Sequence, residues 1–303
     1  MSADILLLAV VDGLAYAGLL FLVALGLTLI FGVMGIVNVA HGSLYAFGGY
    51  TAATFVGWAL QGGGAPPLLL LLGCLLAAAL VVGIVLGVGL DTFLLARVRD
   101  KDPILQLLVT FGAFMILEDV QRLVWGSSPW SASEVVGRVG NLQLFDITYT
   151  RYQLLLVPGI ALSAYGGLQY FLRRTSLGKQ IVAVTHHREV ATALGIDAKR
   201  IGLLTFVLGA TLGALGGALA APTTSLVPGA GTEMIVLSFC VVATAGLGQI
   251  TGALVTAVLI GLARSVAVYT VPELEVVVPY LIMVGVLLVR PSGLFVVARA
   301  RRI

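Results

Sequence analysis

The sequence predicts an all-α integral membrane protein, a polytopic helix bundle with about eight to nine membrane segments, some of them broken or short. Of its 303 residues, 59% are hydrophobic and only 10% are charged, whereas a soluble domain has about 25% charged residues. Apolar runs long enough to span a bilayer as helices recur along the chain. The period-2 alternation typical of a transmembrane barrel is absent from the sequence. We therefore expect a single transmembrane domain over residues 1–303.

Nine apolar segments account for the expected spans. They lie at residues 5–31, 43–60, 67–90, 104–125, 151–172, 201–221, 234–248, 251–270 and 274–290. A short break, GLGQITG at 246–252, separates the seventh and eighth segments. This break is either a loop or a kink buried in the membrane, because membrane helices tolerate glycine interruptions where neighbouring protein satisfies the freed backbone groups.

Basic residues predict the orientation, because Lys and Arg near the ends of spans favour the cytoplasm. They cluster at residues 97–101, 173–200 and 299–302, and the loops on the opposite side are poor in them. Nine crossings, with the N-terminus outside and the C-terminus in the cytoplasm, place every cluster on the cytoplasmic side. The first residues, MSADILLLAVVDG, lack the basic region of a cleavable signal peptide, so we expect the first helix to be retained.

The most polar early stretch, GVMGIVNVAHGSLYAFGGY at 32–50, lies inside a hydrophobic region and contains Asn38, His41 and five glycines. One interpretation is close helix packing with hydrogen bonds between helices. The other is a broken helix beside a polar cavity, since irregular backbone at membrane depth survives only when it is buried in protein or lines such a cavity. The residues alone do not separate the two. A second glycine-rich interruption at 244–252 makes a pair, which is the sequence pattern of a transporter's central pathway.

Glu118 and Asp119 are ionisable residues toward the outer end of the fourth segment. Ionisable groups within a span are costly and are therefore candidates for function. Arg122 lies one helical turn from both acids, so an ion pair is the alternative to a role of Glu118 in a pathway. Asp91 and Arg264 are similar cases in the third and eighth segments.

Residues 173–200 form the one sizeable polar stretch of the chain. Thr175 or Ser176 suits the start of a helix, and Gly195 suits a helix end. Between them, apolar residues recur at roughly helical spacing: Ile181, Val184, Val190, Ala191 and Leu194. The pattern predicts one or two short amphipathic helices at the membrane surface with one face toward the bundle. The alternative is an ordinary solvated loop.

The sequence predicts no cofactor site in this chain. LGKQ at 177–180 contains the Gly-Lys pair of a phosphate-binding loop but lacks its upstream Gly and its following Ser or Thr. His186, His187 and Glu189 suggest a metal site by proximity, but a zinc-binding helix places its two His four residues apart. A solvated or partner-facing role is the alternative that we favour. No basic patch with interleaved aromatic residues indicates a nucleic-acid partner.

The run ALGLTLIFGVMGIVNVAHGSLYAFGGY at 24–50 resembles the N-terminal signature of the inner-membrane permeases of branched-chain amino acid ABC importers, and most closely their H-type subunit. The later stretches that resemble this family are RTSLGKQIVAVTHHREVATALGID at 174–197, GATLGALGGALAAP at 209–222, GLGQITGALVTAVLIGL at 246–262 and YLIMVGVLLVRPSGLF at 280–295. The resemblance covers nearly the whole chain in colinear order.

The resemblance implies a transport subunit of the bacterial inner membrane rather than an enzyme. Its implied partners are a second homologous permease, two cytoplasmic ATPase subunits that bind ATP and Mg, a periplasmic solute-binding protein and membrane lipid. The pathway is expected between the two permeases, which shifts the interpretation of residues 32–50 modestly toward the pathway. The candidate pathway residues are Asn38, His41, Gly42, Glu118, Gly246 and Gly248.

In the wider importer class, the cytoplasmic coupling loop carries a Glu-Ala-Ala-x-x-x-Gly pattern. Glu189, Ala191 and Gly195 match its spacing here, and Val190 replaces the middle Ala. The downstream apolar-Pro element is not recognisable. The candidate ATPase contacts are Arg188, Glu189, Ala191, Leu194 and Gly195.

The expected solute is small and resembles an amino acid, with a branched-chain amino acid favoured. Similar permeases carry urea or amides and small aromatic acids, and these stay open as alternatives. An ion-coupled secondary transporter is a further alternative, which normally relies on intramembrane acids. A membrane enzyme would need His41 and Glu118 within hydrogen-bond reach, directly or through one water.

Overall fold

The computed structural model describes residues 3–62, 66–99, 101–144 and 147–295. Within them, a helix occupies each of the nine segments expected from the sequence, which confirms an all-α membrane architecture. These helices are α1 (Ala3–Met34), α2 (His41–Leu60), α3 (Leu68–Gly89), α5 (Pro103–Trp125), α7 (Val157–Arg174), α10 (Ala198–Ala220), α11 (Ala230–Ala245), α12 (Ile250–Thr270) and α13 (Val277–Val289).

Six helical stretches in the described chain are long and apolar enough to cross a membrane on their own. They contain α1, α3, α5, α7, α10 and α12. The helices α11 and α13 are shorter, with 16 and 13 residues. The number of full crossings, eight or nine, therefore stays a prediction.

Two helices contain turns of π-helix that the sequence did not predict. In the first, η1 (Leu90–Leu95) and α4 (Ala96–Val98) continue α3, so the third helical stretch ends well beyond the expected residue 90. In the second, η2 (Tyr152–Leu156) precedes α7. Turns of π-helix widen the backbone ring and are frequent at functional positions.

The segment at 125–150, expected to be a loop, contains regular structure. It forms α6 (Glu134–Val139) and an antiparallel hairpin of β1 (Asn141–Leu144) and β2 (Ile147–Thr150), with Asn141 opposite Thr150. Strands of four residues are too short for apolar alternation to reveal them, which is why the expectation was wrong. Trp130, before α6, pairs through its backbone with Leu226, which ties this segment to the chain after α10.

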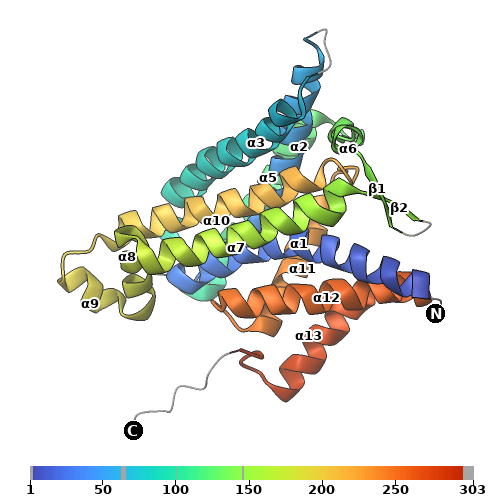
Figure 1. The fold of residues 1–303 in the computed structure, drawn as a ribbon. Helices are drawn as coiled ribbons and strands as arrows, with labels where there is room; N and C mark the ends of the chain where they lie inside the picture. Colours follow the sequence, from blue (N-terminus) through green and yellow to red (C-terminus); the bar gives the residue numbers. More distant parts are fainter. Residues whose placement is uncertain (1–2, 63–65, 100, 145–146, 296–303) are drawn as a thin grey trace.

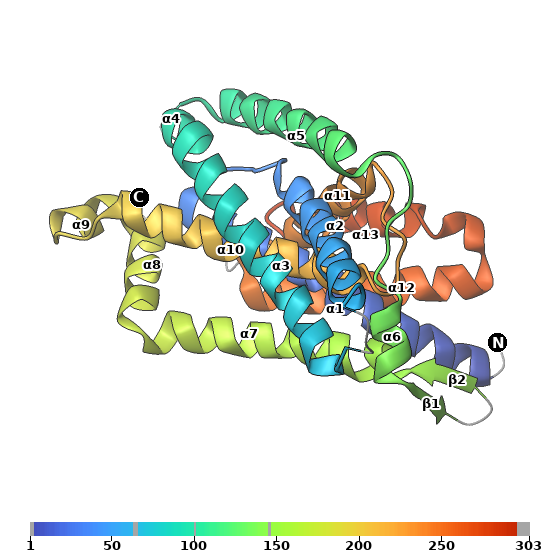
Figure 2. The same cartoon turned by 90° about the horizontal axis from the view of Figure 1, so that it is seen from above.

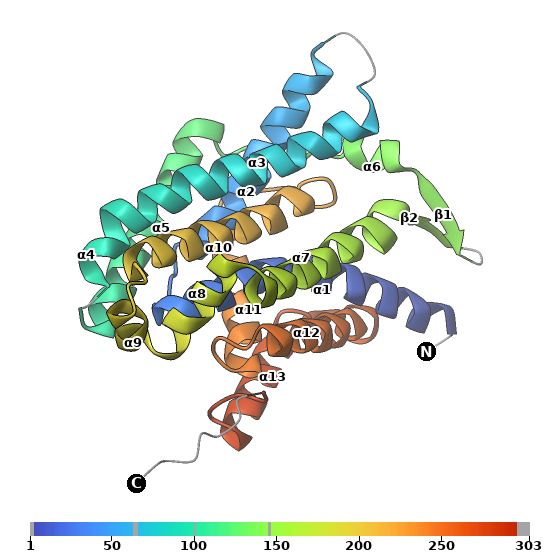
Figure 3. The same cartoon turned by 60° about the vertical axis from the view of Figure 1, so that its left-hand side comes forward.

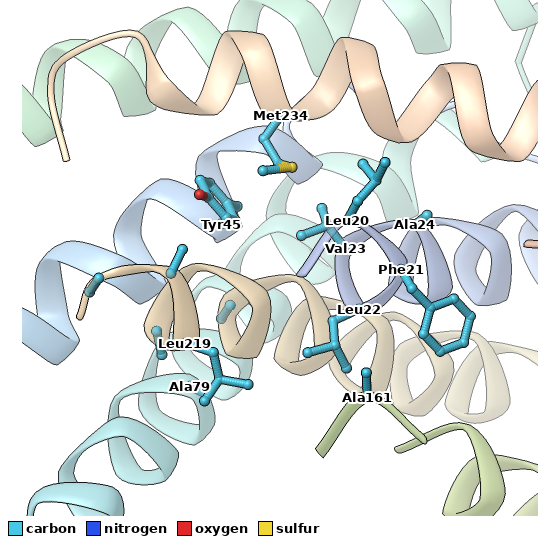
Figure 4. Close-up of a cluster of buried hydrophobic side chains, with 14 of the residues drawn as sticks. Leu20, Phe21, Leu22, Val23, Ala24, Tyr45, Ala79, Ala161, Leu219 and Met234 are labelled. Atoms are coloured by element: carbon cyan, nitrogen blue, oxygen red, sulfur yellow. The ribbon is translucent and has the colours of Figure 1, made fainter. Parts of the chain in front are cut away.

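The helix α1 forms the centre of the bundle and contacts α7, α10, α11 and α12 (Figure 1). Figure 2 shows α5 and α7 at opposite edges of the bundle. The consecutive side chains Leu20 to Ala24 of α1 are buried on all sides, and Figure 4 shows them among Tyr45, Leu219 and Met234. A helix that is hydrophobic all round is expected in such a central position.

The bundle has two distinct ends. The start of α1 and the β1–β2 hairpin lie at one end, and the short helices α8 (Ser176–His186) and α9 (Arg188–Ala193) lie at the other (Figures 1 and 3). We call these the hairpin end and the α9 end. The outer faces of α3 and α5 expose many large apolar side chains, which is typical of surfaces that contact lipid or other membrane helices.

Candidate functional site

The helix α1 ends at Met34, and the chain turns back into the bundle before α2 begins. Gly35 has a φ of +67° and donates its N–H to the Phe31 carbonyl, which ends the helix. At the start of α2, the imidazole Nε2 of His41 donates to the Val23 carbonyl at 3.0 Å. Val23 lies about 16 Å before the end of α1 at a rise of about 1.5 Å per residue. The helix α2 therefore begins well inside the bundle, at a distance from the end of α1 that is about half of the roughly 30 Å hydrocarbon thickness.

The returning backbone of residues 35–40 is held by a side chain from another helix. The Thr110 hydroxyl of α5 accepts from the Val39 N–H at 3.4 Å, and its one proton is shared between the Val37 carbonyl at 3.3 Å and the Leu107 carbonyl of its own helix at 3.0 Å. Thr110 is fully buried. This contact supplies the hydrogen bonds that an irregular backbone needs at membrane depth. The observed geometry is thus a broken helix buried in protein.

The His41 ring packs against α1 and α10 at positions where both helices have glycine and therefore no side chain. A Cβ atom on Gly213 of α10 would be 2.8 Å from the imidazole, and one on Gly26 of α1 would be 3.0 Å from it. Both distances are shorter than ordinary van der Waals contact. Glycines on α1 and α10 therefore make the space that His41 fills.

Three polar atoms in this stretch have no hydrogen-bond partner among the described residues. They are Asn38 Nδ2, His41 Nδ1 and Ser43 Oγ. All three side chains are at most 2% exposed. An unpaired buried polar group costs about 1–3 kcal/mol, so their concentration in one stretch indicates a place where water, a solute or a partner chain completes the hydrogen bonding.

The helix α11 begins beside the start of α2. A Cβ atom on Gly231 would be 2.7 Å from the Gly42 carbonyl oxygen, so the two backbones are in direct contact. Gly42 thus lies where α2 and α11 touch, and its role in a pathway stays a prediction. Two helix N-termini, each with a partial positive charge, meet inside the bundle. Discontinuous helices that meet near the bilayer midplane are the arrangement in which many transporters bind their solutes.

Gly246 and Gly248 form the corner between α11 and α12, with φ of +100° and +81°. A Cβ atom on Gly248 would be 3.2 Å from the Gly32 Cα at the end of α1. The chain after α13 closes the same corner, because the Leu294 and Phe295 N–H groups donate to the Thr244 and Ala245 carbonyls. The break at 246–252 is therefore a tight helix–helix corner packed against protein.

Glu118 forms an ion pair with Arg122 at 2.6 Å, one turn along α5. This is the pairing that the sequence offered as the alternative to a pathway role. Glu118 also borders a cavity of about 10 Å³ with Ser43, Gln121 and Gly231, beside the α2–α11 junction. The described chain contains no hydrogen bond between Glu118 and His41, whose Nε2 bonds to α1 instead.

The 173–200 stretch forms the two short helices that the sequence predicted. The Thr175 hydroxyl accepts from the Gly178 N–H at 3.0 Å and caps α8. Gly195, with a φ of +86°, ends α9 in a Schellman motif, in which the Ile196 N–H donates to the Ala191 carbonyl. Ile181, Val184 and Ala191 are buried against the ends of α7 and α10.

Two of the five periodic apolar residues do not belong to the face that packs on the bundle. Val190 is 56% exposed and Leu194 is 78% exposed. Both belong to the last turn before Gly195, where only Ala191 points inward. The short helix α9 therefore presents apolar side chains outward at the tip of the molecule, next to Glu189 and Arg188.

A buried ion pair lies near the α9 end. The Arg99 guanidinium contacts the Asp91 carboxylate of η1 at 2.5 Å, and both side chains are less than 10% exposed. The guanidinium packs on Gly202 of α10, where a Cβ atom would be 2.7 Å from it. Gln106 donates to the Arg99 and Lys101 carbonyls and fixes this turn. The pair joins the end of the third helical stretch to the helix that follows α9.

The sequence did not reveal a polar cavity at the hairpin end. This cavity has two adjoining lobes of about 260 and 510 Å³, and both lobes are lined by Tyr16, Leu19, Thr224 and Arg264. We call it the hairpin-end cavity. Its ionisable residues come from distant parts of the chain, and Arg264 was the one signal in the sequence that pointed to it.

His186, His187 and Glu189 do not form a metal site in the described chain, where no three His, Cys, Asp or Glu side chains are grouped to hold an ion. The basic residues at 299–302 lie outside the described residues.

Comparison with known proteins gives a consistent result. Residues 9–287 match the family described as "Branched-chain amino acid transport system / permease component". The chain is 27% identical to the high-affinity branched-chain amino acid transport system permease protein LivH of Escherichia coli, with 93% of each chain covered. It is 26% identical to the permease protein BraD of Pseudomonas aeruginosa, with 94% of each chain covered. It is also 27% identical to a probable LivH of Methanocaldococcus jannaschii, over 92% of this chain and 89% of the relative.

Proposed function

The chain belongs to the family of permease components of branched-chain amino acid transport systems, and from this premise we propose that it is one membrane subunit of an ATP-driven importer of branched-chain amino acids. With a second, homologous permease it forms the translocation pathway. Two cytoplasmic ATPase subunits bind ATP and Mg, and a periplasmic solute-binding protein delivers the solute.

The observation that carries this proposal is the junction of α2 and α11. Two helices begin inside the membrane, in contact at Gly42 and Gly231, beside buried polar atoms of Asn38, His41 and Ser43 that have no partner in the described chain. A protein whose only task is to hold helices together gains nothing from unsatisfied polar groups at this depth. A solute pathway requires polar groups there.

The α9 end supports energy coupling by another subunit. A short helix with exposed Val190 and Leu194 at its tip offers apolar contact to a cytoplasmic partner. Its buried face packs on α8 and α10, so a displacement of α9 is transmitted directly to α10 and, through α8, to α7. We place this end in the cytoplasm of a bacterium and the hairpin end outside the inner membrane. The basic residues at 97–101 and 173–200 support this, since Arg99 packs beside the start of α10.

Uptake by the complete complex in proteoliposomes tests the function. With ATP inside and the loaded binding protein outside, the complex is expected to accumulate leucine, isoleucine or valine. Accumulation of urea or benzoate in place of these amino acids would reassign the solute. The Glu118→Gln/Asp119→Asn double variant is expected to keep ATP-dependent uptake. If uptake instead requires an ion gradient and is lost in this variant, the protein is an ion-coupled transporter.

Substitution at the junction tests the pathway residues. Asn38→Leu and His41→Leu keep the approximate side-chain size but remove polar groups, and both are expected to lower uptake while the subunits still assemble. Normal uptake by both variants would remove Asn38 and His41 from the pathway.

A further inference from the structure

The hairpin-end cavity lies among helices that cross the membrane, at the end opposite α9. Its lobes, about 260 and 510 Å³ in volume, are of the size that small-molecule sites occupy. Its walls come from the start of α1, the end of α12, the chain after α10 and the first turn of α11. The larger lobe reaches Gly229 and Ala230, where α11 begins, and therefore extends toward the α2–α11 junction.

One guanidinium is fixed in the wall shared by both lobes. Arg264 forms an ion pair with Glu275 and lies over the Tyr16 ring, with the guanidinium carbon 4.0 Å from the ring centroid. The planar guanidinium has five N–H donors, and Glu275 engages one terminal nitrogen. Donors on the guanidinium remain for a carboxylate, which guanidinium groups bind in a bidentate geometry.

Carboxylates outnumber this guanidinium. Glu275 is paired with Arg264, and Asp12 accepts a hydrogen bond from the Tyr269 hydroxyl. Glu233, in the first turn of α11, has no ion pair and no side-chain hydrogen bond with any residue that the structure describes. Three carboxylates and one guanidinium give the cavity a net negative charge that attracts an ammonium group and repels a simple anion.

Two buried hydroxyl groups in the wall have no partner in the described chain. They are the Tyr16 hydroxyl, on the wall of both lobes, and the Ser265 hydroxyl, on the wall of the smaller one. Ser265 is only 5% exposed. Such groups are expected to be hydrogen-bonded, so they point to a polar occupant. Apolar side chains complete the larger lobe: Leu19, Leu226, Val227 and Met234.

We propose that the hairpin-end cavity binds a zwitterionic α-amino acid as it enters the permease, with Glu233 taking the ammonium group and Arg264 the carboxylate. The aliphatic side chain lies against the apolar wall of the larger lobe. This inference rests on the proposed function and adds to it the site that selects the charge of the solute. Anionic aromatic acids are disfavoured by the net charge, and urea has no charged groups for Glu233 and Arg264 to pair.

A reporter cysteine tests the site in the complete complex. Thr224 is exposed and lines both lobes, so Thr224→Cys is labelled from solution in a background with Cys74→Ala and Cys240→Ala. A cationic methanethiosulfonate is expected to react about tenfold faster than an anionic one of similar size. Glu233→Gln is expected to bring this ratio toward one, whereas Glu273→Gln, an exposed acid at the same end that does not line the cavity, leaves it unchanged.

Protection by leucine analogues identifies the ligand chemistry. L-leucine is expected to slow labelling. Leucine amide, which lacks the carboxylate, is expected to slow labelling less. 4-Methylpentanoate, which lacks the ammonium group, is expected to leave the labelling rate unchanged. Glu233→Gln is expected to abolish the protection by L-leucine. Equal protection by 4-methylpentanoate, or none by L-leucine, would overturn the site.

The uptake assay separates the two proposals. If the complex imports leucine but leucine does not protect the cysteine at position 224 from labelling, the proposed function stands and the proposed binding site is wrong. A complex that does not import leucine loses the proposed function, and protection by L-leucine would then still support an amino-acid site.

Discussion

The contact between His41 and Gly213 shows how single residues shape the candidate pathway. The imidazole occupies space that any Cβ atom on Gly213 would enter, 2.8 Å from the ring. His41 is also anchored to the Val23 carbonyl, so it has little freedom to move aside. The position of α2 in the membrane thus depends on the absence of a side chain on α10.

Gly213→Ala is expected to displace His41 and to destabilise the protein by about 1–3 kcal/mol, because overpacking of a filled site forces neighbours out of position. Thermal unfolding in detergent and leucine uptake measure the effect. Gly166→Ala is the matched control, because a Cβ atom on this α7 glycine meets nothing within 4 Å. Equal behaviour of the two variants would contradict the tight fit at His41.

Thr110→Val is expected to release residues 35–40. The change preserves the shape of the side chain but leaves the Val39 N–H and the Val37 carbonyl without the hydroxyl that holds them. A cost of about 1–3 kcal/mol follows from unpaired backbone groups. Proteolysis of the purified complex detects the loosened segment. Thr270→Val, which removes an exposed hydroxyl bonded within α12, is the control and is expected to behave as the wild type.

Sequence reasoning singled out Asn38, His41 and Gly42 as candidates because polar residues and glycines are conspicuous in an apolar run. It could not identify Thr110, Gly213 or Gly26. A threonine or glycine in a membrane helix is common, and its role depends on a neighbour far along the chain. For Glu118, the helical spacing to Arg122 was sufficient to anticipate the ion pair.

Among the elements, the short helix α9 has one side buried in this chain and one side exposed. Ala191 is buried, whereas Leu194, three residues later, is 78% exposed. Leu194 therefore contributes little to the stability of this chain. Its exposure is explained if it packs on an ATPase subunit.

Leu194→Ala is expected to leave the thermal unfolding of the permease unchanged within about 0.5 kcal/mol. It is expected to weaken copurification of the ATPase and to lower stimulated ATP hydrolysis, since a buried leucine contributes about 1.5–3 kcal/mol to an apolar contact. Leu288→Ala, at an 80% exposed position of α13, provides a control far from α9. Unchanged ATPase binding in Leu194→Ala would place the docking surface elsewhere.

Gly195→Ala is expected to strain the end of α9 by about 1–2 kcal/mol, because Gly195 has a left-handed φ of +86°. No atom lies within 4 Å of the added Cβ, so the effect is conformational rather than steric. Gly195→Asn is expected to be milder, since asparagine tolerates this conformation. Transport-coupled ATP hydrolysis should fall in the order wild type, Asn, Ala. Full stimulation by loaded binding protein in Gly195→Ala would show that α9 is not the coupling element.

Hydropathy predicted every long helix, because a lipid environment imposes continuous apolar runs. It did not predict η1, η2, α6 or the hairpin. A π-turn leaves no periodic signal, and the strands β1 and β2 span only four residues each. The depth at which α2 starts was also hidden, since hydropathy gives the length of an apolar run but not where it lies in the membrane.

On the scale of the whole molecule, distant segments converge at each end. Tyr269 donates to Asp12 across almost the full length of the chain, and Arg264 reaches Tyr16. No spacing rule connects such residues, so the hairpin-end cavity could not be predicted from one sequence. The α9 end was more accessible to sequence reasoning, because its helices, caps and basic residues are local features.

The proposed orientation, with the hairpin end outside and the α9 end in the cytoplasm, predicts opposite accessibility of the two ends. A membrane-impermeant thiol reagent is expected to label Thr148→Cys, in the hairpin, when the outer membrane is permeabilised and the inner membrane is intact. Thr192→Cys in α9 is expected to react only after the inner membrane is permeabilised. Both positions are exposed in this chain. Labelling in the reverse order would invert the assigned orientation.

The contacts of residues 293–295 also bear on the order in which the protein matures. Gly293 lies against Gly246, and Leu294 and Phe295 bond to the last carbonyls of α11. Ribosomes synthesise this segment after α12 and α13, so the corner at Gly246 stays open while the helices are being inserted. Its closure must wait until residues 293–295 have been synthesised, and a ribosome stalled before residue 293 leaves that corner exposed to the cell's proteases.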